Sequence, residues 1–183
     1  PLMWTSQQGH TSVAKLLIDE GANLEAKTNY GFTSLIWASQ EGCASMAKLL
    51  IEKGANLEAK TEFGNTPLIW ACVSDHPDIA KLLIEKGANL EAKDDNDNTP
   101  LIWASQEGYT SMAKLLIEKG ANLEAKTEFS NTPLIWACEN CHTDTAKLLI
   151  EKGANIEAKD QHGKTPLVLG SHGGHIDIAK LLI

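Results

Sequence analysis

Residues 99–131 read TPLIWASQEGYTSMAKLLIEKGANLEAKTEFSN, and this stretch decides the fold because the chain repeats it. Residues 33–65 differ from it at only four positions: Ser34, Cys43, Ala44 and Gly64. A threonine recurs with a spacing of 33 at Thr33, Thr66, Thr99, Thr132 and Thr165. A fixed period of this length is typical of stacked repeat arrays. We therefore divide the 183 residues into six repeats, of which the first and last are truncated: 1–32, 33–65, 66–98, 99–131, 132–164 and 165–183.

Each repeat carries the signals of two helices. In residues 99–131, Thr99 is a good N-cap and Pro100 suits the first helical position. Gly108 ends this first helix, and a second helix begins near Ser111 with apolar residues at helical spacing. Gly120 stands where the glycine after a helix belongs. The polar, turn-rich residues 121–131 then link to the next repeat.

With these signals, the sequence resembles the ankyrin repeat over its whole length. The opening signature of the family appears as Thr66-Pro67-Leu68-Ile69-Trp70-Ala71, with isoleucine in place of the usual histidine. The Leu-Leu-x-x-x-Gly-Ala core appears as residues 82–88. The resemblance implies one array over residues 1–183 with an all-α repeat solenoid fold, an ankyrin helix–turn–helix stack with β-hairpin-like fingertip loops. It also implies a non-catalytic scaffold that binds a protein or peptide partner through a concave groove and its fingertips.

Composition excludes several other classes of function. The net charge is −8, and all 16 cationic residues are lysine, which argues against a nucleic-acid partner. Apolar stretches of only a few residues predict no membrane insertion. No nucleophile–base pair, phosphate loop or paired-carboxylate motif stands out, so we expect no enzyme, no catalytic residues, no cofactor and no metal. Free thiols and the lack of a signal segment predict an intracellular, cytoplasmic location.

Three short motifs resemble metal or haem sites when they are taken alone. Residues 138–142, Cys-Glu-Asn-Cys-His, match a haem-attachment pattern, but both cysteines and His142 fall on ordinary repeat positions. The acidic run 94–98 begins like a calcium loop, yet it lacks the required glycine and the final glutamate. His172 and His175 are spaced to hold a metal weakly, although His175 is a repeat histidine. We favour a structural interpretation of all three.

Five tryptophans also follow the repeat, at Trp4, Trp37, Trp70, Trp103 and Trp136. They form either a ladder that stacks on a ligand or a core ladder between adjacent helices. Because ligand sites are few per protein whereas this position recurs in nearly every repeat, we favour the core interpretation. Each indole would then bury about 150–250 Å².

Two charged ladders share the period. The lysines are Lys27, Lys60, Lys93, Lys126 and Lys159, and glutamates lie two residues before them at Glu25, Glu58, Glu91, Glu124 and Glu157. Either the lysines bind acidic segments of a partner, or they form solvated salt bridges between repeats that contribute about 0–1 kcal/mol each. We favour the second interpretation.

Positions that vary between otherwise similar repeats are better candidates for recognition. They lie in the fingertips and at the exposed ends of the first helices. Aromatic residues among them are candidate hot spots because large rigid side chains anchor interfaces. The predicted partner-binding residues are Tyr30, Phe32, Gln40, Glu41, Glu62, Phe63, Val73, Asp95, Asn96, Gln106, Glu107, Glu128, Phe129, Glu139, Gln161, His162 and His172.

Two further expectations concern the chain as a whole. The first is an alternative function, in which this segment is a structural spacer of a larger protein whose enzymatic or channel activity lies elsewhere. The second is that exposed apolar ends, Leu2 and residues 181–183, produce end-to-end self-association or poor solubility unless they are capped.

Overall fold

The computed structural model describes residues 1–183, and all of its regular secondary structure is helical. It has twelve helices, two in each repeat. They are α1 (Leu2–Gln7), α2 (Thr11–Asp19), α3 (Ser34–Gln40), α4 (Ala44–Glu52), α5 (Pro67–Val73), α6 (Pro77–Glu85), α7 (Pro100–Gln106), α8 (Thr110–Glu118), α9 (Pro133–Glu139), α10 (Thr143–Glu151), α11 (Pro166–His172) and α12 (Ile176–Leu182). None of them combines the length and the apolar character that crossing a membrane needs. The expected all-α repeat fold is confirmed.

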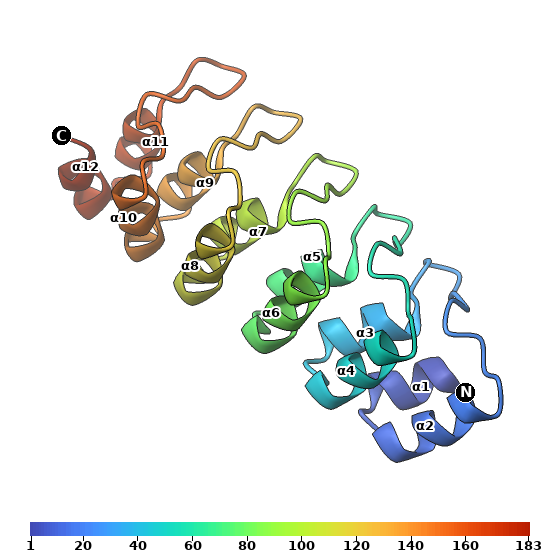
Figure 1. Ribbon diagram of the computed structural model, residues 1–183. Helices are drawn as coiled ribbons and strands as arrows, with labels where there is room; N and C mark the ends of the chain where they lie inside the picture. The colour runs from blue at the N-terminus through green and yellow to red at the C-terminus, as the bar shows by residue number, and fades with distance from the viewer. The chain divides into compact units, whose positions relative to one another are not determined.

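The chain divides into two compact blocks, each of which is a stack of helix pairs. The N-terminal block, Pro1–Asp95, contains α1 to α6, and the C-terminal block, Asn96–Ile183, contains α7 to α12. In the N-terminal block α3 contacts α1 and α5, while α4 contacts α2 and α6 (Figure 1). In the C-terminal block α9 contacts α7 and α11, while α10 contacts α8 and α12. First helices therefore pack on first helices, and second helices pack on second helices.

The recurring threonines begin the first helices of five repeats. Each threonine Oγ1 atom accepts a hydrogen bond from the backbone N–H three residues later, at 3.3 to 3.5 Å. This bond satisfies one of the N–H groups that the first turn of a helix leaves unpaired. Proline follows the threonine at the start of α5, α7, α9 and α11, as its fixed φ allows.

Left-handed backbone ends the helices at the positions that the sequence indicates. Gly120 follows α8 with φ +95°, a conformation that costs glycine little because it has no Cβ. Cys141 has φ +63° in the turn between α9 and α10, where residues 42 and 108 are glycine. A side chain in this region is strained, so Cys141 is an unfavourable substitution at a glycine position.

The second helices bury one face. In α8, Met112, Ala113 and Leu116 are inaccessible to solvent, as their helical spacing predicts, and Ile117 is half-buried. Leu2, which we expected to be exposed, is buried because it holds the repeat position of Leu35 and Leu68. The hydrophobic core of each block therefore lies between its helix layers.

The fingertip loops form hairpin-like turns without regular strands. In one of them the Thr127 N–H donates to the Asn131 carbonyl at 3.1 Å. Successive fingertips also bond to each other: the Glu62 N–H donates to the Tyr30 carbonyl at 3.0 Å, and the Gln161 N–H donates to the Phe129 carbonyl at 3.0 Å. These bonds hold the fingertips of each block in a row beside the helices (Figure 1).

Candidate functional site

In each block, tryptophans line hollows between the first helices and the fingertips, and we call these hollows the groove of that block. The core interpretation of the tryptophans is wrong for Trp4, which is 71% exposed, and incomplete for the other four, which are half-buried. In the N-terminal block, Trp4 and Trp37 border a small hollow of about 100 Å³. Four of the five tryptophans follow a leucine and an isoleucine that are buried in the core, so the indole, one residue further along the short helix, lies beside that core rather than inside it.

In the N-terminal block, the slot between Trp37 and Trp70 is filled by the ring of Phe32. The ring centroid of Phe32 lies 4.7 Å from that of Trp37 and 5.3 Å from that of Trp70, with interplanar angles of 34° and 44°. Phe32 also packs on buried Ile36 and Ala59, and only 9% of it is exposed. The expected exposure of Phe32 is therefore wrong, because the ring stacks between the two indoles.

In the C-terminal block, the corresponding slot between Trp103 and Trp136 is open. The smaller Asn98 stands at the position of Phe32, and the hollow has a volume of about 440 Å³. Its lining consists of Asn96, Asn98, Trp103, Gln106, Thr127, Glu128, Phe129 and Trp136. Every equivalent residue in the N-terminal block is identical except Tyr30 for Asn96 and Phe32 for Asn98. In both slots the Nε1 atom of the second indole, Trp70 or Trp136, is buried without a hydrogen-bond partner.

The structure brings several predicted site residues together in this hollow. Asn96, Glu128 and Phe129 reach it from two fingertips, and Gln106 reaches it from the end of α7. Gln106 Nε2 donates to the Glu107 carboxylate at 3.3 Å, which places a second acidic group beside the hollow. Phe63 and Phe129 are 59% and 46% exposed, as expected for fingertip anchors. Of the other predicted residues, Gln40 and Val73 are half-buried, and the following are exposed: Tyr30, Glu41, Glu62, Asp95, Glu139, Gln161, His162 and His172.

Trp103, Trp136, Asn98 and Thr127 also line the hollow, although none of them is among the predicted partner-binding residues. For the tryptophans the sequence analysis favours the core over a ligand ladder. For the tryptophans a usable signal existed: an indole following two aliphatic residues on a seven-residue helix falls off the core face. Asn98 was detectable only by aligning it with Phe32, since the same position changes from a ring to an amide.

The two charged ladders join neighbouring repeats through backbone groups. In the N-terminal block, Lys27 Nζ donates to the Lys60 carbonyl at 3.0 Å, and the Glu25 carboxylate accepts the Asn56 N–H at 2.8 Å. In the C-terminal block, the Glu124 carboxylate accepts the Asn155 N–H at 2.8 Å. For Lys27, Glu25 and Glu124, hydrogen bonds to the backbone take the place of the predicted salt bridges. A charged side chain that binds a backbone group of the next repeat acts as part of the scaffold.

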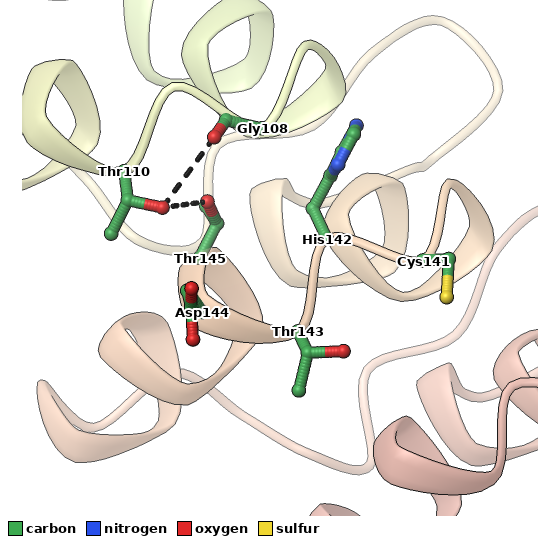
Figure 2. Close-up of a pocket in the computed structure, with 7 residues that line it drawn as sticks. All are labelled: Gly108, Thr110, Cys141, His142, Thr143, Asp144 and Thr145. Carbon is green, nitrogen blue, oxygen red and sulfur yellow. Dashed lines mark hydrogen bonds between the residues drawn. The ribbon is translucent and has the colours of Figure 1, made fainter.

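Cys138 and His142 of the haem-like motif (residues 138–142) have separate structural roles. Cys138 is buried in α9, and burial raises the pKa of its thiol to about 12. The His142 ring nitrogen Nε2 lies 2.9 Å from the Gln106 carbonyl, to which it bonds. Figure 2 shows the side chains of Cys141 and His142 pointing in opposite directions. The structure contains no group of three or more His, Cys, Asp or Glu side chains that could hold a metal ion.

A second, polar depression of about 300 Å³ lies where α8 and α10 begin (Figure 2). The Thr110 and Thr145 hydroxyls share a hydrogen bond of 2.8 Å at its edge. Thr145 is fully buried at the repeat position that Met112 and Ile178 hold elsewhere, so its hydroxyl depends on this bond. The depression has no tryptophan, tyrosine or phenylalanine in its lining and no carboxylate other than that of the exposed Asp144, which makes it a weaker candidate than the hollow.

Comparison with known proteins gives one clear match. A family model described as ankyrin repeats in three copies matches residues 1–61, 56–127 and 123–183, and so spans the chain. No curated protein matches the chain.

Proposed function

Because the chain belongs to the ankyrin repeat family, whose repeats are generally protein–protein interaction modules, we propose that it binds a protein or peptide partner in the groove. The observation that carries this proposal is the open hollow of the C-terminal block. Trp103, Trp136 and Phe129 line it, and the half-exposed Phe129 stands at its fingertip edge. Binding pockets combine an apolar, aromatic lining with a few polar groups, as this hollow does. Exposed large apolar side chains that share one concave face mark interaction surfaces.

The ankyrin repeat family is typically non-catalytic. In this chain the two most buried thiols, Cys72 and Cys138, have raised pKa values because of desolvation, which suppresses the nucleophilic thiolate form. We therefore propose a scaffold role without catalysis. The four free cysteines favour a reducing, intracellular compartment for it.

The proposal is tested by selecting binders from a random-peptide display library against the full chain. A selected peptide should bind the groove, and Phe63→Ala or Phe129→Ala should weaken it at least about tenfold, as truncation of an aromatic anchor does. Leu16→Ala is the matched control, because Leu16 is an equally exposed apolar residue on α2 that no groove hollow includes. Unchanged affinity in both phenylalanine variants, with helical circular dichroism retained, would contradict the groove assignment. A selection that yields no specific binder would favour the spacer function.

End-to-end self-association is a second proposal, and it concerns apolar residues exposed on α2 and α11. Val13 is 50% exposed on α2, although the same repeat position is buried in α4 and α6. Val168 is exposed on α11, although the same position is buried at Ile135 on α9. A second copy that stacked its last helix pair on α1 and α2 would cover both faces in the way that neighbouring repeats do. Sedimentation should show association that Val13→Asp weakens, and a clean monomer at high concentration would refute this proposal.

A further inference from the structure

Each block has a slot between two tryptophans, and the slot of the N-terminal block is filled whereas that of the C-terminal block is open. Six of the eight lining positions are identical between the slot at Trp37 and Trp70 and the slot at Trp103 and Trp136. The filled slot holds a flat ring, Phe32, at centroid distances of 4.7 and 5.3 Å from its two indoles. The open slot has the smaller Asn98 at that position. A flat group brought by a partner is therefore the shape that the open slot fits.

The polar residues that line the open slot favour a positive charge on the group that it receives. Glu128, which carries a carboxylate, lines the slot from the fingertip, and Asn96 and Gln106 are lining residues with amide side chains. Glu107, which is bonded to Gln106, contributes a second carboxylate nearby. No lysine or histidine lines the hollow, so none of its lining residues neutralises Glu128. Indole faces attract cations through their quadrupole, which adds to the attraction of the carboxylates.

Arginine alone among the side chains combines a flat shape with a permanent positive charge. Its guanidinium stacks on aromatic faces, and its five donors suit carboxylate and amide oxygens. A lysine ammonium is compact and strongly hydrated, so it fills a flat slot less well. A neutral ring would fill the slot as Phe32 does but would leave Glu128 without a cation.

We propose that the hollow between Trp103 and Trp136 is an arginine pocket, which receives a guanidinium from the protein partner. This inference rests on the proposed function and names the chemistry of the partner. The N-terminal block carries the same pocket in a form that Phe32 closes. Asn98 is thus the residue that decides which slot accepts a ligand.

The pocket is tested with short peptides and the indole N–H signals of the ¹⁵N-labelled full chain. The probe is the capped peptide Gly-Ser-Arg-Ser-Gly, and matched peptides carry citrulline, lysine or phenylalanine in the central place. The arginine peptide should shift the signals of Trp103 and Trp136 with millimolar affinity and leave those of Trp37 and Trp70 unchanged. Citrulline has nearly the same flat shape without the charge, and should bind about tenfold more weakly, which corresponds to about 1.4 kcal/mol.

Variants separate the charge of the pocket from its shape. Glu128→Gln should weaken the arginine peptide about tenfold, whereas Glu62→Gln, the same change in the filled slot, should have no effect. Asn98→Phe should close the pocket and abolish the shifts. Phe32→Asn should open the other slot, so that the arginine peptide also shifts Trp37 and Trp70. Glu128→Gln retains the shape of the side chain, so it tests the charge even if Asn98→Phe disturbs folding.

The inference is overturned if citrulline or phenylalanine peptides bind as tightly as the arginine peptide, or if the shifts are absent. It is also overturned if Glu128→Gln leaves the affinity unchanged. Selected peptides that bind the groove without arginine would sustain the proposed function and refute only the arginine pocket. Conversely, shifts by the arginine peptide in a chain that yields no selected binder would show a guanidinium site but refute its assignment to a protein partner.

Discussion

Removing the Phe32 ring should destabilise the N-terminal block, although Phe32 lies in a fingertip loop. The ring is only 9% exposed and contacts Trp37, Trp70 and the buried Ile36. Phe32→Ala deletes the ring and leaves the slot between the two indoles empty. Because loop residues normally tolerate such changes, a large effect would show that this ring belongs to the core.

The expected magnitude follows from burial and from the ring contacts. Complete loss of a buried phenylalanine costs about 3–5 kcal/mol, which includes the cavity term. Both centroid distances, 4.7 and 5.3 Å, lie in the range of favourable aromatic pairs. The slot faces the groove, so water can enter it and relieve part of the cavity cost. We therefore expect a loss near the lower limit, about 3 kcal/mol in the free energy of unfolding of this block.

Equilibrium urea unfolding, followed by circular dichroism and by tryptophan fluorescence, measures this loss. Phe63→Ala is the matched control, because Phe63 belongs to the same block and is 59% exposed. The control should change stability by no more than about 0.5 kcal/mol. The emission of folded Phe32→Ala should also shift to the red, since Trp37 and Trp70 gain contact with water. A loss no larger than that of the control, about 0.5 kcal/mol, would refute the packing of Phe32 between the indoles.

Four further predictions concern a helix cap, the buried thiols and a turn. Thr66→Ala should cost about 1 kcal/mol in urea unfolding, and Thr66→Ser should retain most of the stability, because the cap depends on the hydroxyl; equal losses in the two variants would contradict this. Burial raises the pKa of the Cys138 thiol from 9.0 to about 12 and also raises that of Cys72, so a thiol reagent at pH 8 should label Cys141 and spare both until the chain unfolds. The unfolded thiols ionise near their ordinary pKa, whereas the folded thiols stay neutral. Their contribution to the free energy of unfolding should therefore be complete below about pH 9 and decline as the pH rises toward 12. Cys138→Ala should reduce that decline. Cys141→Gly should stabilise the C-terminal block by about 0.5–1 kcal/mol by relieving φ +63°, and a loss of stability would refute that strain.

The local structure was largely predictable because its signals are local. Thr99 and Pro100 mark the start of α7, and the glycine at residue 120 marks the end of the second helix, since caps and left-handed turns depend on a few adjacent residues. The predicted start of the second helix near Ser111 is one residue later than the observed start at Thr110. Such small errors are expected where the first turn lacks a side-chain cap, as it does in α8.

The functional surface was predictable only in part. The variable positions led to Glu128 and Phe129, which do line the hollow. The same reasoning placed Phe32 on the exposed surface and the tryptophans in the core, and both assignments changed once neighbouring repeats packed together. The lysine ladder also changed meaning, because Lys27 meets a backbone carbonyl rather than a carboxylate. Each of these outcomes depends on residues one repeat away.

The sequence by itself determined the period of 33, the helix pair of each repeat and the family, because these follow from caps, turns and apolar spacing within one repeat. Only the tertiary structure decided which slot between two tryptophans is filled and which is open. The slot at Trp37 and Trp70 closes because Phe32 reaches between two indoles that are 33 residues apart in sequence. The slot at Trp103 and Trp136 stays open because Asn98 is too small to span it. Packing between repeats, rather than any local preference, sets that difference.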